Sequence, residues 1–274
     1  MSSSPPYSVA ARRLEACFGP PPDVAIVLGS GMGPVRRQLV EVQAVEYAAL
    51  DLPTPGVAGH GGEAILGTMA GVRVLLLSGR VHSYEGRPME EVVRATRALG
   101  TWGVKRLIFT AASGSTRPEL RPGTLVRLTD HLNLTGLNPL RGPNDDALGP
   151  RFPDISKAYD PQLGAVLDEA LEAVGAPWAR GVYCFTGGPS YESPAEVRMV
   201  AALGGDLVGM STVPEIIAGA QLGLRMAAIG VVSNLGAGLA EEHLTHEDVT
   251  RVVGGAADRL GAVFLRALPG LLQA

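Results

Sequence analysis

The sequence predicts an α/β fold in which helices cover both faces of a central sheet. Three observations predict it: short apolar runs recur along the chain, segments with helical spacing lie between them, and the last long segment has one apolar helical face. The apolar runs span residues 24–28, 72–77, 106–111, 124–128, 181–185 and 226–232. Because these runs are apolar almost without interruption, we expect strands that are buried on both sides.

Three of the expected helices have recognisable starts or faces. Residues 193–196 are Ser-Pro-Ala-Glu, a capping box with proline in the first helical position, and residues 212–215 are Thr-Val-Pro-Glu and repeat the device. From His246 onward, apolar residues keep helical spacing as far as Val263. We therefore expect a long amphipathic helix to close the chain.

Two segments lack a periodic pattern. The opening MSSSPPY has neither a basic nor an apolar stretch, so we expect residues 1–6 to form a disordered lead rather than a signal peptide. Residues 134–160 are rich in Pro, Gly, Asn and Asp and predict an unusually long loop, a kind of segment that is often functional. A domain boundary in this loop is the alternative. Strand and helix patterns resume after it in the same style, which favours one domain over residues 7–274.

Composition and charge exclude several classes of function. The chain of 274 residues has 23 Lys+Arg against 27 Asp+Glu, a net charge of −4, and so lacks the basic surface of a nucleic-acid-binding protein. Its apolar runs are far shorter than the ~20 residues of a membrane helix, so we expect no membrane partner. Cys17 and Cys184 are too few for a disulfide framework, and we expect a reduced, cytoplasmic protein.

Lysine usage excludes two kinds of chemistry. Lys105 and Lys157 are the only lysines, and neither ends a glycine-rich loop, so a P-loop nucleotide hydrolase is excluded. A lysine Schiff base has only these two candidates, one at the start of a strand pattern and one in a polar loop. Pyridoxal chemistry is therefore disfavoured.

The first apolar run is followed by Gly-Ser-Gly-Met-Gly at residues 29–33. Backbone N–H groups in such a loop, together with the Ser30 hydroxyl, can bind phosphate oxygens. The dinucleotide fingerprint fails because Pro34 stands where its third glycine is required. From the residues alone, a structural tight turn is the alternative to a phosphate loop.

The second apolar run is followed by Gly-Arg-Val-His-Ser-Tyr-Glu-Gly at residues 79–86. Arg80 offers a planar fork of donors for phosphate, His82 can donate or transfer a proton, and Tyr84 offers an apolar wall with a polar tip. The ends of strands in open α/β sheets are where ligands bind. The same alternation also fits a solvated strand edge, and His60, which lies between glycines, fits a ligand contact and an ordinary loop equally well.

Candidate contacts for a flat ring precede the first capped helix. Glu192 can accept hydrogen bonds from ring N–H groups, and Tyr191 can pack on a ring face. A glutamate near a helix N-terminus is also favourable for the helix dipole alone, which is the alternative. Asn234, at the end of the last apolar run, can donate and accept at once, although asparagine also ends strands for local reasons.

His243 and His246 could share a helix face as metal ligands. Their spacing is not that of the zinc motif H-E-x-x-H, and the sequence indicates no third ligand. Thr245 followed by Asp248 predicts a capped helix start instead, so we expect no metal.

Taken together, these segments resemble the trimeric purine nucleoside phosphorylases of the inosine and guanosine type, within the nucleoside phosphorylase family. The resemblance covers nearly the whole chain and implies a mixed, twisted central sheet and a homotrimer. It rests on several motifs in the right order: GSGMG at 29–33, GHGGE at 59–63, GRVHSYEG at 79–86, NPLRGPND at 138–145, RFPDISKAYD at 151–160, GGPSYESPAE at 187–196, GMSTVPE at 209–215 and SNLGAG at 233–238.

The resemblance also implies a role for each candidate residue. The implied phosphate site comprises Ser30, His60, Arg80, His82, Ser211 and the backbone of Ala111. The implied sugar site comprises Tyr84, Tyr183, Met210 and His246, with Phe152 reaching in from a neighbouring subunit. The implied base site comprises Tyr191, Glu192, Val208 and Asn234. The implied catalytic residues are His82, Glu192 and Asn234.

The implied reaction is phosphorolysis: phosphate attacks C1′ of a purine nucleoside and releases the base and a (deoxy)ribose 1-phosphate, without cofactor or metal. Negative charge grows on the leaving purine in the oxocarbenium-like transition state. Glu192 with Asn234 is the family's 6-oxopurine combination, so we expect inosine and guanosine as substrates. The alternatives are a methylthioadenosine phosphorylase and a nucleoside-binding protein without turnover.

The chain departs from the family pattern at Thr110, Ser113 and Leu235, and His243 is an extra histidine near the loop that closes over the base. The family's Asn-Ala-Ala-Gly-Gly appears here as Thr-Ala-Ala-Ser-Gly at residues 110–114, and Leu235 stands where a lysine often follows the asparagine. Ser113 replaces a glycine whose backbone could need a positive φ. We expect these departures to affect substrate range and rate more than reaction class.

Overall fold

Nine strands form one sheet in the computed structural model, which describes residues 4–57, 61–239 and 246–274, the side chain of His246 excepted. The strands are β1 (Val24–Leu28), β2 (Val40–Glu46), β3 (Glu63–Met69), β4 (Val72–Ser78), β5 (Arg106–Ser115), β6 (Leu125–Asn133), β7 (Trp178–Phe185), β8 (Leu207–Gly209) and β9 (Arg225–Leu235). Their order is β2-β3-β4-β1-β5-β8-β7-β6-β9, and β9 also pairs with β5, so the last five strands close into a ring. Parallel and antiparallel pairs both occur, which confirms the mixed sheet.

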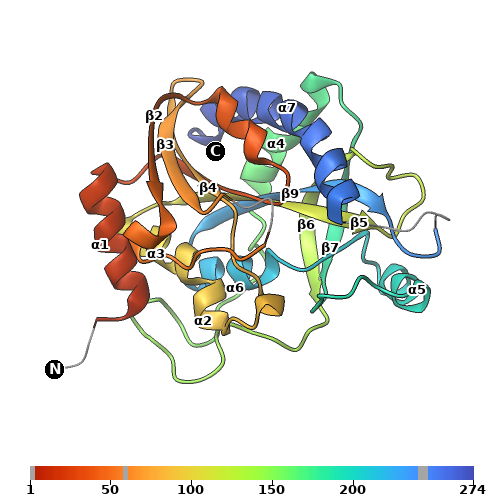
Figure 1. The fold of residues 1–274 in the computed structure, drawn as a ribbon, viewed down its shortest axis with the longest axis horizontal. Helices are drawn as coiled ribbons and strands as arrows, with labels where there is room; N and C mark the ends of the chain where they lie inside the picture. Colours follow the sequence, from red (N-terminus) through yellow and green to blue (C-terminus); the bar gives the residue numbers. More distant parts are fainter. Residues whose placement is uncertain (1–3, 58–60, 240–245) are drawn as a thin grey trace.

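Helices cover both faces of this sheet, as the apolar runs predict. They are α1 (Pro6–Phe18), α2 (Met89–Val92), α3 (Arg94–Trp102), α4 (Pro161–Val174), α5 (Pro194–Ala202), α6 (Val213–Gln221) and α7 (His246–Leu271). Figure 1 shows α4 and α7 on one side of the strands and α1, α3 and α6 on the other. In the described part of the chain, none of the helices combines the length and hydropathy that a membrane span requires.

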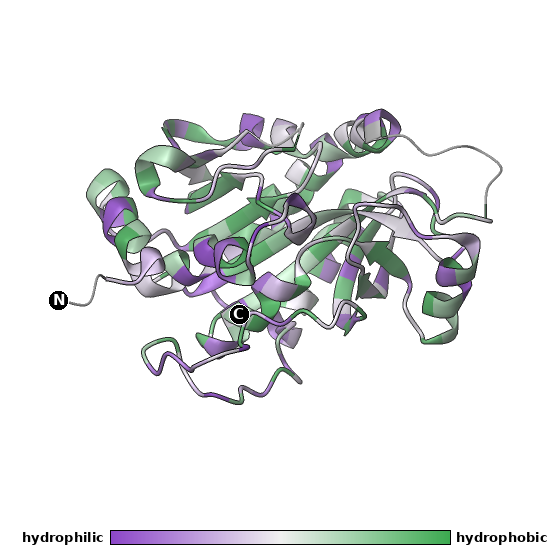
Figure 2. Cartoon of the chain, turned by 60° about the horizontal axis from the view of Figure 1, so that its bottom comes forward, coloured by the Kyte–Doolittle hydropathy of each residue, from purple (hydrophilic) through white to green (hydrophobic). Residues whose placement is uncertain are grey.

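Strand β1 shows why its sequence is apolar without alternation. Ala25 and Val27 pack in the cluster with α1, α3 and α6, whereas Val24, Ile26 and Leu28 pack in the cluster with α4 and α7. Both faces of the strand are therefore buried, and every position must be apolar. Figure 2 shows the same pattern, with hydrophobic residues concentrated on the central strands.

All six predicted strands are present, and β1 has the predicted bounds. The prediction missed β3, the short β8, and β2, which lies at the sheet edge and is mostly exposed. In β2, exposure on both faces removes the apolar signal on which the prediction depends. Helices α5 and α6 begin where the capping sequences predict, and α7 closes the chain.

The two segments without a periodic pattern have different outcomes. Residues 134–160 contain no helix or strand, which confirms the long loop between β6 and α4. Helix α1 begins at Pro6, inside the expected lead, and has proline in its first turn, where a missing N–H costs nothing. Of the rest of the lead, residues 1–3 lie outside the described residues.

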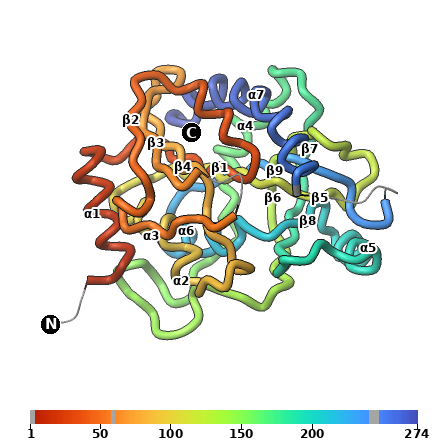
Figure 3. The backbone as a smooth tube through the Cα atoms, in the orientation of Figure 1, coloured from red at the N-terminus to blue at the C-terminus, as the bar shows by residue number. Residues whose placement is uncertain are grey.

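The sheet brings distant segments to one edge. Strand β1 runs parallel to β4 and β5, and β5 runs parallel to β9. Their carboxyl ends therefore meet at the same edge, and the central strands lie side by side in Figure 3 although they come from all parts of the sequence. Ligands of open α/β sheets bind at such an edge.

Candidate active site

A cavity of about 330 Å³ opens at this edge of the sheet. Its walls come from residues after β1 and β4, from β5, from the ends of β8 and β9 with the residues that follow them, from α7, and from the residues before α5. A cavity of this size, whose wall combines apolar surface with many polar side chains, suits a small polar organic ligand. Of the candidate residues, the structure brings these to its wall: Ser30, Arg80, His82, Tyr84, Ala111, Tyr191, Glu192, Val208, Met210, Ser211 and Asn234.

Two candidates lie elsewhere. Tyr183 is fully buried and does not line the cavity; its hydroxyl lies behind Gly209, where a Cβ atom would collide with it. It accepts a hydrogen bond of 3.3 Å from the Ser211 N–H, so it supports the wall instead of forming it. Phe152 is 88% exposed on the long loop and lines a different hollow.

The remaining histidine candidates are not described. His60 lies outside the described residues, as do His243 and Thr245, and His246 is described only by its place at the start of α7. In the part of the chain that the structure describes, no group of three or more His, Cys, Asp or Glu side chains could hold a metal.

The glycine-rich loop after β1 is tied to β5 by Thr110. The Gly29 N–H donates to Thr110 Oγ1 at 2.9 Å, and that hydroxyl donates in turn to the Val27 carbonyl at 3.0 Å. A Cβ atom at position 29 would lie 2.8 Å from the Thr110 carbonyl oxygen, so only glycine allows this approach. One of the chain's departures from the family pattern therefore helps to hold the candidate phosphate loop.

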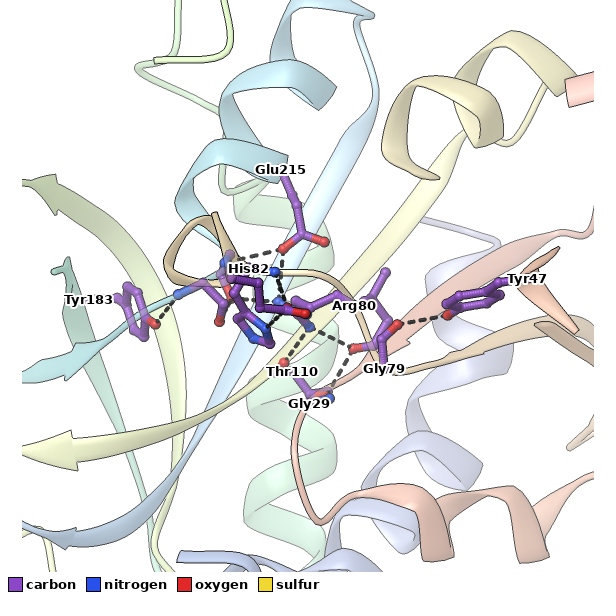
Figure 4. Close-up of polar contacts among 12 residues, drawn as sticks. Gly29, Tyr47, Gly79, Arg80, His82, Thr110, Tyr183 and Glu215 are labelled. Atoms are coloured by element: carbon purple, nitrogen blue, oxygen red, sulfur yellow. Dashed lines mark hydrogen bonds and ion pairs between the residues drawn. The ribbon is translucent and has the colours of Figure 1, made fainter. Parts of the chain in front are cut away.

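Arg80 is the centre of the polar network in Figure 4. Its Nη1 donates to Thr212 Oγ1 and to Glu215 Oε2, both at 2.9 Å, and its Nη2 donates to the Thr110 carbonyl at 2.7 Å and the Val27 carbonyl at 3.3 Å. The sequence predicts a planar fork for phosphate, but the structure directs both Nη groups of this 5% exposed arginine to the protein. Arg80 thus brings a fixed positive charge to the wall.

Glu215 is a site residue that sequence reasoning missed. Its Oε2 accepts from the Thr212 N–H at 3.2 Å, as a capping glutamate does, but it is only 3% exposed and pairs with Arg80. Burial raises the pKa of its carboxyl group, while Arg80 acts in the opposite direction. A signal was available: residues 213–219 contain no other charge, and a buried helix with one carboxylate needs a cation for it.

Thr212 holds a backbone that is rare for its type. Its φ is 68°, in a region that β-branched residues avoid and that costs roughly 1–3 kcal/mol. It persists because its N–H and its hydroxyl are both held, by Glu215 and Arg80. The hydroxyl of Ser211 lies 3.2 Å from that of Thr212, so the strained turn also directs Ser211.

His82 is neutral at physiological pH. Burial, with a smaller effect of Arg80, lowers its pKa to about 3. Its Nδ1 lies 3.2 Å from Glu85 Oε1, and its backbone N–H donates to the same oxygen at 2.7 Å. The ring of Tyr84 stacks on the imidazole with 4.7 Å between centroids, so the neutral ring is held firmly at the wall.

The candidate base-site residues Glu192 and Asn234 each accept a hydrogen bond from a nearby hydroxyl group. Thr186 Oγ1 donates to Glu192 Oε1 at 2.6 Å, and Ser233 Oγ donates to Asn234 Oδ1 at 2.6 Å. The Asn234 amide nitrogen donates to the Leu235 carbonyl at 2.9 Å. An amide nitrogen carries two hydrogens, so one remains for a ligand.

Ser113 does not disturb the loop shape. It lies within β5 and has no positive φ, so the glycine of the family pattern is not required here. Its own hydroxyl is buried and has no hydrogen-bond partner among the described residues. Such a group costs about 1–3 kcal/mol.

The family model, the curated relatives and the solved structures that match this chain are all phosphorylases. The model of the phosphorylase superfamily matches residues 23–269. The chain is 39% identical over 252 residues to purine nucleoside phosphorylase 1 of Bacillus subtilis (strain 168), covering 92% of each chain. It is 40% identical over 248 residues to the purine nucleoside phosphorylase of Mycobacterium tuberculosis (strain ATCC 25618 / H37Rv), covering 88% of this chain and 87% of that one.

Solved structures agree. The purine nucleoside phosphorylase of Schistosoma mansoni in complex with inosine has a TM-score of 0.90 to this structure at 31% identity, over 96% of this chain and 95% of that one. Its complex with adenosine also has a TM-score of 0.90, at 32% identity and the same coverage.

Proposed function

The chain belongs to the phosphorylase superfamily, among its purine nucleoside phosphorylases, and from this premise we propose that it cleaves 6-oxopurine nucleosides in purine salvage. The substrates are inosine and guanosine, in ribo or deoxy form, with phosphate as co-substrate. The products are the free base and (deoxy)ribose 1-phosphate. One observation carries the proposal: a single cavity is lined both by an anion-binding set, Ser30, Arg80, His82 and Ser211, and by a ring-binding set, Tyr191, Glu192, Val208 and Asn234.

The phosphate set supports the attack on C1′. Hydroxyl groups of Ser30 and Ser211, the backbone at Ala111 and the charge of Arg80 hold the dianion, with His60 as a further contact. Bound phosphate stabilises the positive charge that grows on the sugar, and fixing both reactants lowers the barrier further. Tyr84, Met210 and His246 hold the sugar, with Tyr183 supporting them from behind Gly209.

The ring set supports departure of the purine and its selection. Glu192 accepts from N1–H, and Asn234 donates to N7 or O6, where negative charge develops; such a donor can contribute about 3 kcal/mol. Because Asn234 Nδ2 uses one hydrogen for the Leu235 carbonyl, its second N–H is the group offered to the ligand. That arrangement favours a 6-oxo group over a 6-amino group.

A phosphate-dependent assay of base release tests the function. Wild type and Asn234→Asp are compared on inosine, guanosine, adenosine and methylthioadenosine, with and without phosphate. We expect wild type to cleave the first two only when phosphate is present, and the variant to gain activity on adenosine, because an aspartate accepts from a 6-amino group.

Other results would change the proposal in defined ways. Preference of wild type for 6-amino substrates would contradict the assignment of Glu192 and Asn234 while leaving the reaction class intact. Adenosine has been seen bound to the Schistosoma mansoni enzyme, which makes it the substrate to compare first. Loss of base release in every condition would leave a nucleoside-binding protein.

We also propose a homotrimer in which Phe152 enters the neighbouring subunit's sugar site. The support is its 88% exposure on the long loop, together with Leu134 and Ile155, which are 41% and 40% exposed. Large apolar side chains gathered on a loop favour a protein partner. A monomeric mass in solution with full activity would contradict this role, as would a Phe152→Ala variant with unchanged KM for inosine.

For the reaction and its place we propose no cofactor or metal and a cytoplasmic location. Every group that the reaction needs is supplied by the side chains above and by phosphate itself. The two cysteines are unpaired, Cys17 exposed and Cys184 buried, as suits a reducing compartment.

A further inference from the structure

Glu215 makes two contacts to the candidate phosphate side at once. Its Oε2 lies 2.9 Å from Arg80 Nη1 and 3.2 Å from the backbone nitrogen of Thr212. Arg80 and Glu215 are separated by 135 residues in sequence, and both side chains are 4% exposed. One buried oxygen atom therefore joins the segment after β4 to the start of α6.

The first contact fixes the plane of the guanidinium group. With Nη1 held by α6 and Nη2 held by carbonyls of β1 and β5, Arg80 is anchored from three elements. The carboxylate is the charged member of this set, and charge-assisted hydrogen bonds are the stronger ones. Moving Glu215 would therefore displace the arginine more than losing one carbonyl contact would.

The second contact fixes a strained turn. The Thr212 N–H donates to Glu215, while Thr212 holds a φ of 68° that its side chain disfavours. Ser211, whose hydroxyl lines the cavity, directly precedes it and contacts its hydroxyl. If the carboxylate moved, the backbone of Thr212 could relax to a favoured conformation and turn Ser211 away.

We propose that Glu215 is a positioning residue for phosphate, acting through Arg80 and through the turn formed by Ser211 and Thr212. The inference rests on the proposed function, because it takes the charge of Arg80 and the hydroxyl of Ser211 as parts of the phosphate site. It assigns Glu215 a role beyond helix capping, and it predicts that the geometry of the carboxylate, as well as its charge, matters. Figure 4 shows Glu215 beside Arg80. Glu215 does not line the cavity, so it acts through other residues and does not touch substrate.

The variant Glu215→Asp tests this role because it keeps the charge and moves the carboxylate by one methylene. We expect at least a tenfold rise in KM for phosphate and less than a twofold change in KM for inosine. Glu196→Asp is the matched control: Glu196 occupies the corresponding position in α5 and accepts from the Ser193 N–H at 2.7 Å, but it is exposed. It should change neither constant by more than twofold.

Binding of inorganic phosphate alone, measured by calorimetry, separates this inference from the proposed function. If wild type binds phosphate and Glu215→Asp binds it at least ten times more weakly, the positioning role stands even if wild type cleaves no nucleoside. Equal phosphate affinity of the two proteins, or an equal rise in both KM values, would overturn it. Absence of phosphate binding by wild type would overturn both proposals.

A second variant covers the case in which Glu215→Asp does not fold. Thr212→Val keeps the branched shape but removes the hydroxyl that accepts from Arg80 at 2.9 Å. We expect it to raise KM for phosphate about fivefold and to leave KM for inosine within twofold. An unchanged KM for phosphate would show that Arg80 needs no support from this side, and the inference would fail.

Discussion

Helices α5 and α6 begin with the same sequence device but use it differently. Each has a hydroxyl residue at its N-cap, proline in its first turn and glutamate at its third position. In α5, Ser193 and Glu196 satisfy each other's backbone N–H groups at the surface. In α6, Glu215 accepts from the Thr212 backbone N–H but also pairs with Arg80. The Thr212 hydroxyl accepts a hydrogen bond from the same arginine.

The difference comes from the surroundings of the two helices. Helix α5 buries only Val197 and Val200, whereas eight of the nine residues of α6 are buried. At the surface, water solvates a glutamate, and the residue has only a capping role. In the interior the same carboxylate needs a cation, and here that cation is a residue of the candidate active site. A local motif therefore predicts a helix start, and burial decides what else its side chains do.

Truncation of the two glutamates should give the largest difference between α5 and α6. Glu215→Ala leaves Arg80 charged, buried and without its carboxylate, and arginine does not lose its proton. We expect a loss of about 3–5 kcal/mol in the free energy of unfolding, measured by chemical denaturation. Glu196→Ala should have a much smaller effect, since its carboxylate is exposed. Equal losses in the two variants would show that burial makes no difference.

Removing the arginine instead should cost less, because a carboxyl group can be neutralised. In Arg80→Met, Glu215 becomes a lone buried acid, and the same burial that raises its pKa in wild type acts without opposition. We expect a loss of about 1–3 kcal/mol. A folded-state pKa above the usual 4.5 means that stability is kept at low pH and lost as pH rises through it. Denaturation of the variant and of wild type at about pH 5 and about pH 8 checks this sign; a variant that loses no more stability than wild type between the lower and the higher pH contradicts it.

His82 lines the same cavity as Arg80, and burial suppresses its positive charge. Its pKa is about 3 in the folded protein against 6.5 for a free histidine, so between these values only the unfolded chain binds the proton. Stability should therefore fall as pH drops below about 6.5, with a slope of up to about 1.4 kcal/mol per pH unit. His82→Asn should flatten the slope. Burial also lowers the pKa of His131, so His131→Asn should flatten the slope as well; an unchanged slope in His82→Asn would contradict the prediction for His82.

The smallest effects concern two buried hydroxyl groups with opposite roles. Thr212 accepts from Arg80, whereas Ser113 has no hydrogen-bond partner in the described residues. Thr212→Val should lower the free energy of unfolding by about 1–2 kcal/mol, and Ser113→Ala should raise it by about 1 kcal/mol. Thermal unfolding of both variants measures the two signs, and a destabilised Ser113→Ala would indicate a partner for that hydroxyl.

Much of the candidate site could be predicted because its residues follow strands. Ser30, Arg80 and Asn234 each lie just after or at the end of an apolar run, and parallel strands bring such positions to one edge. Tyr183 could not be placed in this way. Tyr183 lies inside β7, and only the pairing of β7 with β8 shows that its side chain lies behind Gly209.

Sequence alone determined the α/β class, six strands, two capped helix starts, the closing helix and the family. These features depend on neighbouring residues or on motifs that can be read in order, so no knowledge of the packing is needed. The tertiary structure decided that Thr110 ties the glycine-rich loop, that Arg80 turns both Nη groups to the protein, and that a capping glutamate becomes its counter-ion. These contacts join segments 30 to 135 residues apart. These contacts are necessary because their polar groups are buried, and the groups become buried only when distant segments of the chain pack together.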